Sequence, residues 1–207
     1  MTKVSLLGDS VRLQYQPMTE ELLGEDFEVF GPKENCRFAK YTLRGLFDWA
    51  EDMRGSRIVH WNNGMWDICN LFGDGLFSSE EEYVSNILRI ADILLARHEV
   101  VIFATTTPVK SENRYNRLED IKHYNDLIVP KLREKGVLIN DLYALTAVDI
   151  DRYVAEDTLH LSEEGIALCA KQVAEVIKAA AEKLPKETAV QTAEVDADGA
   201  PVLYNGL

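Results

Sequence analysis

Short apolar runs alternate with longer amphipathic segments along the chain. Five of the runs are five to nine residues long and rich in β-branched side chains; they cover residues 3–8, 27–31, 57–62, 99–107 and 137–143. Runs of this length are too short for buried helices and are typical of strands that are covered on both faces of a parallel sheet. The pattern therefore predicts five strands, of which 99–107 has the strongest signal.

The segments between these runs carry helical patterns. Apolar residues recur at helical spacing in four of them, which are 41–53, 79–97, 115–135 and the segment after Ser162. Ser79 and Glu82 have the spacing of a capping box, and Ser162 is a good N-cap for the last helix. Pro130 is expected to bend or interrupt the third of these helices.

Alternating strands and helices predict an α/β fold with helices on both faces of the sheet. We expect a three-layer α/β/α sandwich around a five-stranded parallel sheet, of the flavodoxin-like kind. A chain of 207 residues with 46% hydrophobic content can bury the core of one such domain. The domain is predicted to cover residues 1–185, and residues 186–207, which have little periodicity, are predicted to form a C-terminal tail.

Polar residues follow three of the predicted strands. Gly8-Asp9-Ser10 comes after the first strand, Asn62 and Asn63 come after the third, and threonines close the fourth. The carboxyl ends of parallel strands meet at one edge of a sheet, and ligands of such folds bind there. The sequence therefore predicts a functional site at this edge.

Composition narrows the function classes. A net charge of −13 repels phosphate backbones and anionic bilayers, so we expect neither a nucleic-acid nor a membrane partner. Three cysteines are an odd, sparse set, which is typical of a reducing compartment, and the N-terminal residues lack the pattern of a signal peptide. We therefore expect a cytoplasmic protein. Histidine and cysteine are too scattered for a zinc site, so no metal is expected.

Ser10 becomes a nucleophile only with a base, a group that orients the base, and donors for the oxyanion. His160 is the best candidate base, because it lies in a polar loop three residues after Asp157. In one tight turn, residues at this spacing lie close together, so the carboxylate can hold Nδ1 and leave Nε2 facing a neighbour. Taken alone, D-x-x-H is more often an incidental turn. The other histidines are expected at a helix end, on a helix surface and in a strand, and they are His98, His123 and His60.

The combination of Gly8-Asp9-Ser10, an asparagine after the third strand and D-x-x-H before the last helix resembles the SGNH, or GDSL-like, hydrolase family over residues 3–184. The resemblance implies that Ser10 is the nucleophile and that its N–H belongs to the oxyanion hole. It implies that His160 is the base and that Asp157 orients it. The implied reaction is hydrolysis of an ester through an acyl-enzyme, without a cofactor.

Two blocks depart from the family pattern. The family's G-x-N-D block reads WNNG at 61–64 here. The resemblance then places the oxyanion asparagine at Asn63, or at Asn62 after a shift of one residue. A family glycine whose N–H completes the oxyanion hole corresponds to Gly31, or, in a different alignment, to the backbone at Lys40.

Three residues near these blocks are predicted to contact substrate. Trp61 and Trp66 flank the asparagines and offer platforms for a sugar ring or an acyl chain, although aromatic residues beside a strand end are as often packing residues. Asn35 is predicted to line the pocket, whereas an exposed position is expected for Arg12.

The predicted function is a serine esterase for a small acyl ester, with carbohydrate O-acetyl groups among the candidates. The alternative is a non-catalytic flavodoxin-like module that binds a small ligand, and a third hypothesis is a metal-dependent phosphoesterase. Neither the fold nor the composition selects the ester or the oligomeric state.

Overall fold

The computed structural model describes residues 1–185, so the predicted C-terminal tail lies outside the described residues. Five strands form one sheet in the order β2-β1-β3-β4-β5, and every neighbouring pair is parallel. This is the flavodoxin-like strand order, and the predicted fold class is confirmed. The strands are β1 (Thr2–Leu7), β2 (Phe27–Phe30), β3 (Ile58–Trp61), β4 (Val100–Ala104) and β5 (Leu138–Asn140).

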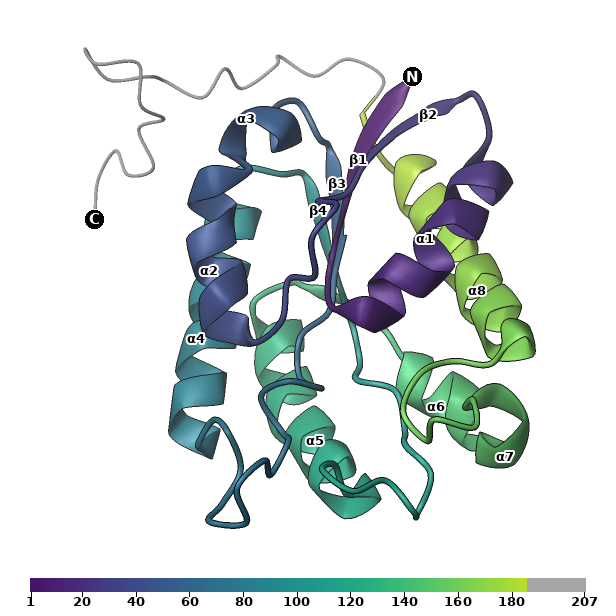
Figure 1. The fold of residues 1–207 in the computed structure, drawn as a ribbon. Coiled ribbons are helices and arrows are strands. Elements are labelled where there is room, and N and C mark those ends of the chain that lie inside the picture. The colour runs from purple at the N-terminus through teal and green to yellow at the C-terminus, as the bar shows by residue number, and fades with distance from the viewer. Residues whose placement is uncertain (186–207) are drawn as a thin grey trace.

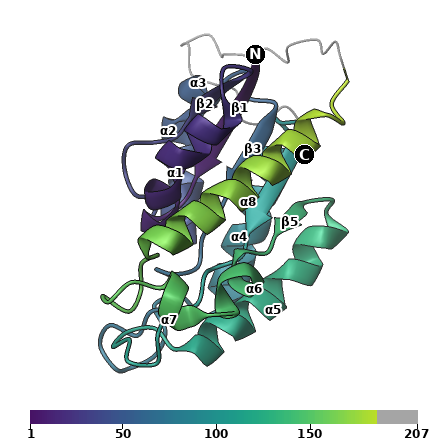
Figure 2. The same cartoon turned by 90° about the vertical axis from the view of Figure 1, so that its right-hand side faces the viewer.

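Helices cover both faces of the sheet (Figure 1). One face carries α2 (Ala39–Asp48), α4 (Glu80–Leu95) and α5 (Leu118–Glu134). The other face carries α1 (Ser10–Leu23) and α8 (Glu163–Ala181), which lie beside each other in Figure 2. Three short helices complete the described chain, namely α3 (Ala50–Met53), α6 (Leu142–Ala147) and α7 (Ile150–Tyr153).

The central strands are buried on both sides, which explains their continuous apolar sequences. In β3, Val59 and Trp61 point into the core under α2, α4 and α5, whereas Ile58 points into the core under α1 and α8. All four residues of this strand are buried. Each face of the sheet thus has its own hydrophobic core, and these two cores fix the helices that carry the site residues.

Helix ends follow the capping signals of the sequence. Ser79 and Glu82 form the predicted capping box at the start of α4, and the Ser162 hydroxyl accepts a hydrogen bond from Gly165 N at 3.1 Å at the start of α8. Pro130, which was expected to bend or interrupt α5, does not interrupt it, because this helix continues to Glu134. Ile128 and Leu132 are fully buried on either side of this proline, so tertiary packing offsets the missing backbone hydrogen bond.

The predicted functional site lies at the edge of the sheet where β1 and β3 end and the loops after them begin. Leu7 at the end of β1 pairs with Trp61 at the end of β3, so the residues that follow each strand lie side by side. Between these two strands the chain order of the sheet reverses, which is the position where ligands of such folds bind. The fold therefore places Ser10 and the asparagine pair at the same edge of the sheet.

Candidate active site

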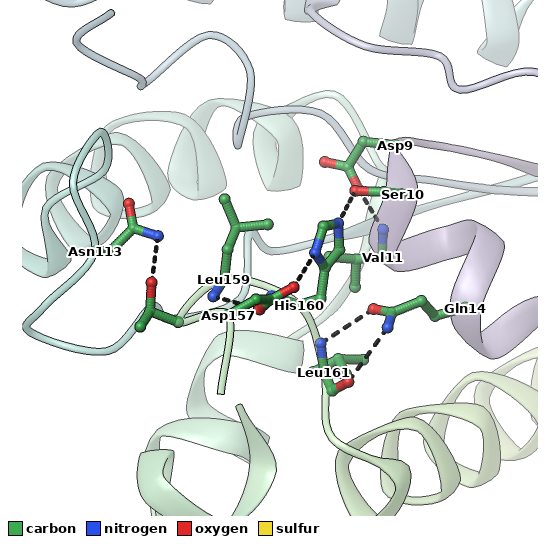
Figure 3. Close-up of polar contacts among 10 residues, drawn as sticks. Asp9, Ser10, Val11, Gln14, Asn113, Asp157, Leu159, His160 and Leu161 are labelled. Atoms are coloured by element: carbon green, nitrogen blue, oxygen red, sulfur yellow. Dashed lines mark hydrogen bonds and ion pairs between the residues drawn. The ribbon is translucent and has the colours of Figure 1, made fainter. Parts of the chain in front are cut away.

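Ser10, His160 and Asp157 form a continuous hydrogen-bonded chain (Figure 3). The Oγ atom of Ser10, the first residue of α1, lies 2.8 Å from Nε2 of His160, although the two residues are 150 positions apart. Nδ1 of His160 lies 2.7 Å from Oδ2 of Asp157. An ionised carboxylate only accepts hydrogen bonds, so Nδ1 carries the proton and Nε2 accepts from the serine hydroxyl. The three side chains are arranged to remove a proton from Ser10.

A tight turn holds the carboxylate beside the imidazole. Oδ1 of Asp157 accepts hydrogen bonds from the backbone N–H groups of Leu159 at 3.0 Å and His160 at 2.9 Å. Thr158, which lies between Asp157 and Leu159, has a φ of 71°, in the left-handed region. Partial burial acts to raise the pKa of Asp157, but the hydrogen bonds from Leu159 and His160 outweigh it and hold this pKa below its ordinary value. The group that orients the imidazole is therefore ionised at neutral pH.

The two asparagines after β3 face different neighbours. Asn63 is fully buried, and its Nδ2 donates to the Arg37 carbonyl at 3.0 Å and to the Thr42 hydroxyl at 2.9 Å. Asn62 hydrogen-bonds to Asp9, the N-cap of α1. Asn63 therefore joins the end of β3 to the beginning of α2, while Asn62 lies against the residue that precedes the serine.

Gly64 lets the chain turn tightly after the asparagine pair. Its φ is 150°, and a Cβ atom at this position would lie only 2.0 Å from the Thr106 hydroxyl oxygen. Any side chain would push the loop after β3 away from the loop after β4. The close approach of these two loops therefore requires glycine at position 64.

The two candidate segments for the second oxyanion donor, at Gly31 and near Lys40, have different neighbours. A Cβ atom on Gly31 would lie 2.3 Å from Oε1 of Gln16, which is six residues beyond Ser10 on α1. Cys36 N, by contrast, donates to the carbonyl of Gly8 at 3.0 Å, two residues before Ser10. The segment that approaches Ser10 therefore leads into the first turn of α2, which contains Lys40 and has N–H groups without intrahelical partners.

Arg12 is buried rather than exposed, so the expectation for it was wrong. The side chain is 1% exposed, and its guanidinium donates to the carbonyl oxygens of Pro32 and Glu34, both at 2.9 Å. It also donates to the carbonyl of Gly8 at 3.2 Å. Arg12 thus fixes the loop after β2 against α1. The hydrophobic pattern of the sequence does not indicate this role, because Arg12 acts through hydrogen bonds to backbone carbonyls.

The predicted substrate contacts have three different outcomes. Trp61 has no exposed surface and packs with its ring centroid 4.9 Å from that of Phe103, so it is a core residue and that prediction was wrong. Oδ1 of Asn35 accepts from Arg37 N at 2.7 Å and thereby shapes the loop before α2. Trp66 is 40% exposed and is available to a ligand.

Trp66 belongs to a group of exposed apolar side chains on the loops that follow β3 and β4. We call this group the apolar rim; its members are Trp66, Leu71, Phe72, Phe77 and Tyr115. The two loops are joined by a hydrogen bond of 2.7 Å from Asn70 N to the Tyr115 carbonyl. The ring of Phe77 lies 5.2 Å from that of Phe38, which precedes α2. The rim therefore adjoins the loop that Asn63 binds.

Asp67 is a buried carboxyl that connects the rim loop to α2. It accepts hydrogen bonds from Ala39 N, at 3.0 Å to Oδ2, and from the Ser78 hydroxyl, at 3.0 Å to Oδ1. Burial raises its pKa from 3.8 to about 7, although both hydrogen bonds act to lower it. Sequence reasoning did not identify this residue, because its partners lie far away along the chain.

We predict that Asp67 makes stability depend on pH. Because its pKa is raised in the folded state, the folded chain binds more protons than the unfolded chain between pH 3.8 and about 7. The free energy of unfolding therefore falls as pH rises through this window, by at most on the order of 4 kcal/mol. Urea unfolding at several pH values measures this slope, and the Asp67→Asn variant should lack it. Asp74→Asn, in an exposed loop, is the control; parallel pH profiles for wild type and Asp67→Asn would contradict the prediction.

Neither a metal-ion site nor a membrane-spanning helix is found in the described part of the chain. Among residues 1–185, no group of three or more His, Cys, Asp or Glu side chains is placed to hold a metal ion. None of the helices in this described part is long and apolar enough to cross a bilayer.

The backbone is similar to those of several solved hydrolase structures. A lipase/acylhydrolase from Enterococcus faecalis has a TM-score of 0.72 at 20% identity, over 91% of this chain and 100% of that one. A GDSL-like lipase from Bacteroides thetaiotaomicron has a TM-score of 0.71 at 16% identity, over 86% and 89%. An acetylxylan esterase from Geobacillus stearothermophilus has a TM-score of 0.68 at 14% identity, over 85% and 94%.

Comparison of the sequence, in contrast to comparison of the structure, identifies no relative. No protein-family model matches the chain, and no curated protein matches it. The structural likeness nevertheless covers 85–91% of this chain. The chain therefore has the α/β/α fold of the SGNH, or GDSL-like, hydrolases.

Proposed function

We propose that this protein is a serine hydrolase that cleaves carboxylic esters through an acyl-enzyme. The observation that carries the proposal is the chain of short contacts from Ser10 through His160 to Asp157. The names of the similar structures support it, because they describe lipases, acylhydrolases and acetylxylan esterases. A fold alone does not establish an activity, so the proposal depends on the site geometry.

In the first step, Oγ of Ser10 attacks the ester carbonyl carbon while Nε2 of His160 takes the hydroxyl proton. The carbonyl π bond opens and its electron pair moves to the oxygen, which becomes an oxyanion. Asp157 stabilises the imidazolium that forms. The tetrahedral intermediate then expels the alcohol, which receives the proton from His160, and an ester bond to Ser10 remains.

The oxyanion needs hydrogen-bond donors that are already in place. We propose the N–H of Ser10, which lies at the first position of α1 and has no intrahelical acceptor. We propose the first turn of α2 near Lys40 as the other side of the hole. Both N–H groups of the Asn63 amide already donate, to the Arg37 carbonyl and to the Thr42 hydroxyl, so we propose that Asn63 positions this turn instead of donating to the oxyanion. Donors fixed at two helix starts stabilise the developing charge without reorganising.

Deacylation requires water at the same base. The side chains of His160 and Asp157 are 36% and 52% exposed, so water reaches the imidazole. Nε2 takes a proton from this water as its oxygen attacks the acyl carbon, and the proton then returns to Oγ of Ser10 as the carboxylic acid leaves. One base therefore serves both halves of the reaction.

For the substrate we propose a small acyl ester, with an O-acetylated carbohydrate as one class. The apolar rim offers Trp66 and Phe77 as partly exposed faces beside the site, and aromatic rings of this kind contact both acyl chains and the apolar faces of sugars. The acetylxylan esterases among the similar structures support the carbohydrate class.

A fluorophosphonate probe tests the proposed function directly, because it phosphonylates a serine that a neighbouring base activates. We expect wild type to gain one adduct, mapped by mass spectrometry to Ser10, and to hydrolyse p-nitrophenyl acetate. Ser10→Ala should lose both the adduct and the turnover. Ser85→Ala, an exposed position on α4, is the matched control and should keep both.

Two outcomes would overturn the proposed function. One is folded wild type that neither reacts with the probe nor hydrolyses any ester in a panel of p-nitrophenyl esters and acetylated sugars, which would favour the ligand-binding alternative. The other is an adduct and turnover that persist in Ser10→Ala, which would mean that another residue is the nucleophile.

A further inference from the structure

Gln14 lies one helical turn beyond the nucleophile on α1. Residues four apart on a helix lie on the same face, and Figure 3 shows Ser10 and Gln14 both directed toward the loop that carries His160. The side-chain amide of Gln14 makes two hydrogen bonds to Leu161, the next residue in that loop. Nε2 donates to the Leu161 carbonyl at 3.2 Å, and Oε1 accepts from Leu161 N at 3.0 Å.

The other hydrogen bonds of this loop do not fix it to the nucleophile. Leu161 pairs with Val154 in an isolated bridge, and Ala155 N donates to the His160 carbonyl at 2.8 Å, so these contacts are internal. Asn113 binds the Thr158 hydroxyl at 3.0 Å and joins the loop to the segment after β4. Among the described residues, the hydrogen bonds between 154–161 and α1 are the one to Ser10 itself and the two from Gln14.

Leu161 transmits this contact to the base through a single peptide unit. Its side chain is 2% exposed and packs in the core under α1 and α8, so the residue has little freedom to move. The Gln14 amide fixes where Leu161 lies along α1, because the donor and the acceptor of this planar group match the C=O and N–H of one residue. The same rigid helix therefore holds Oγ of Ser10 and the backbone next to His160.

We propose that Gln14 is a positioning residue that holds Nε2 of His160 within hydrogen-bond distance of Oγ of Ser10. The inference rests on the proposed function and extends it to a residue outside the triad. Proton transfer requires the two atoms at about 2.6–3.2 Å, and a misplacement of about 1 Å costs up to about 10²-fold in rate. Loss of both Gln14 hydrogen bonds is expected to lower kcat by about 10- to 100-fold and to leave KM within about twofold.

The test compares two variants of Gln14 in the full chain. Gln14→Met keeps the length of the side chain and removes both hydrogen bonds, while Gln14→Glu keeps an acceptor for Leu161 N and loses the donor to its carbonyl. Gln172→Met makes the same substitution on α8 and is the matched control. Four quantities are measured for each protein: kcat and KM for p-nitrophenyl acetate, the rate constant of fluorophosphonate labelling, the midpoint of thermal unfolding, and the hydrogen exchange rate of Leu161 N–H.

The proposal expects kcat and the labelling rate to fall together in Gln14→Met, with KM and the unfolding midpoint near wild type and faster exchange at Leu161. Gln14→Glu should also lose kcat, and Gln172→Met should behave as wild type. An unchanged kcat in Gln14→Met would overturn the proposal. A loss of kcat that only follows the loss of folded protein, or that is equal in Gln172→Met, would overturn it as well.

Failure of the proposed function gives a different result. In that case wild type itself lacks both the adduct and the turnover. Exchange at Leu161 then decides the role of Gln14, because the contact does not depend on catalysis. Faster exchange in Gln14→Met at an unchanged unfolding midpoint would support the positioning contact, and unchanged exchange would overturn it.

Discussion

Replacing His160 with alanine is expected to lower kcat for p-nitrophenyl acetate by about 10⁴-fold or more, without unfolding the chain. The serine hydroxyl is a poor nucleophile while it keeps its proton, and Nε2 of His160 is the acceptor 2.8 Å away. The side chain of His160 is 36% exposed, so its removal leaves no large cavity in the core. Steady-state kinetics together with a thermal unfolding curve measure both parts of this prediction.

Two other histidines serve as controls for this variant. His123 is on the exposed side of α5, with Nε2 2.8 Å from Glu80, and His98 binds the Ser56 carbonyl through Nδ1 at 2.7 Å. Both alanine variants should keep wild-type kcat per folded molecule. A His160→Ala protein with a tenth or more of the wild-type kcat would refute the assignment of the base.

Asp157→Asn is expected to lower kcat by about 10³- to 10⁴-fold. Asparagine keeps an oxygen for the backbone N–H groups of Leu159 and His160, so the turn survives. The second carboxylate oxygen becomes an NH₂ group, however, and a donor facing Nδ1 favours the imidazole tautomer whose proton is on Nε2. In that tautomer His160 cannot accept the proton of Ser10. Kinetics at constant pH measure the loss.

The control for this variant is Asp149→Asn, at the N-cap of α7. Oδ1 of Asp149 accepts from Arg152 N at 3.2 Å, and asparagine is an equally good N-cap, so activity and stability should stay near wild type. If Asp157→Asn retains kcat within tenfold of wild type, the carboxylate is a turn residue rather than the group that orients the base.

The sheet could be predicted from the sequence because its central strands, β1, β3 and β4, are largely buried on both faces and have continuous apolar sequences. The ends of the strands were predicted less accurately, because polar side chains determine where a strand stops. The run 99–107 ends as a strand at Ala104, because the Thr105 hydroxyl donates to Asp141 at 2.8 Å and the chain turns there. The run 137–143 ends at Asn140 for a related reason, because Asp141 caps α6.

The short helices had no clear signal in the sequence. α6 and α7 have six and four residues, which is too short for an apolar period to be recognised. Their caps are visible only in retrospect, as Asp141 and Asp149. These two helices matter for the site, because they lead into the loop that carries His160.

The predicted triad residues could be found because local spacing and strand ends identify them. Their supports could not be found in this way. Arg12, Gln14 and Asp67 bind backbone groups that are distant along the chain, and only the folded structure brings these partners together. Trp61 failed as a substrate contact because a strand that is covered on both faces buries its last residue as well as its first.

The separation of Ser10 and His160 in the sequence has a consequence for biosynthesis. Ser10 leaves the ribosome first, and His160 follows 150 residues later, just ahead of the helix α8 that packs against α1. During translation the nascent chain therefore carries an unactivated alcohol. Under the proposed mechanism, Ser10 gains its base only when His160 has been synthesised and folded beside it, so a chain that ends before residue 160 is expected to lack esterase activity.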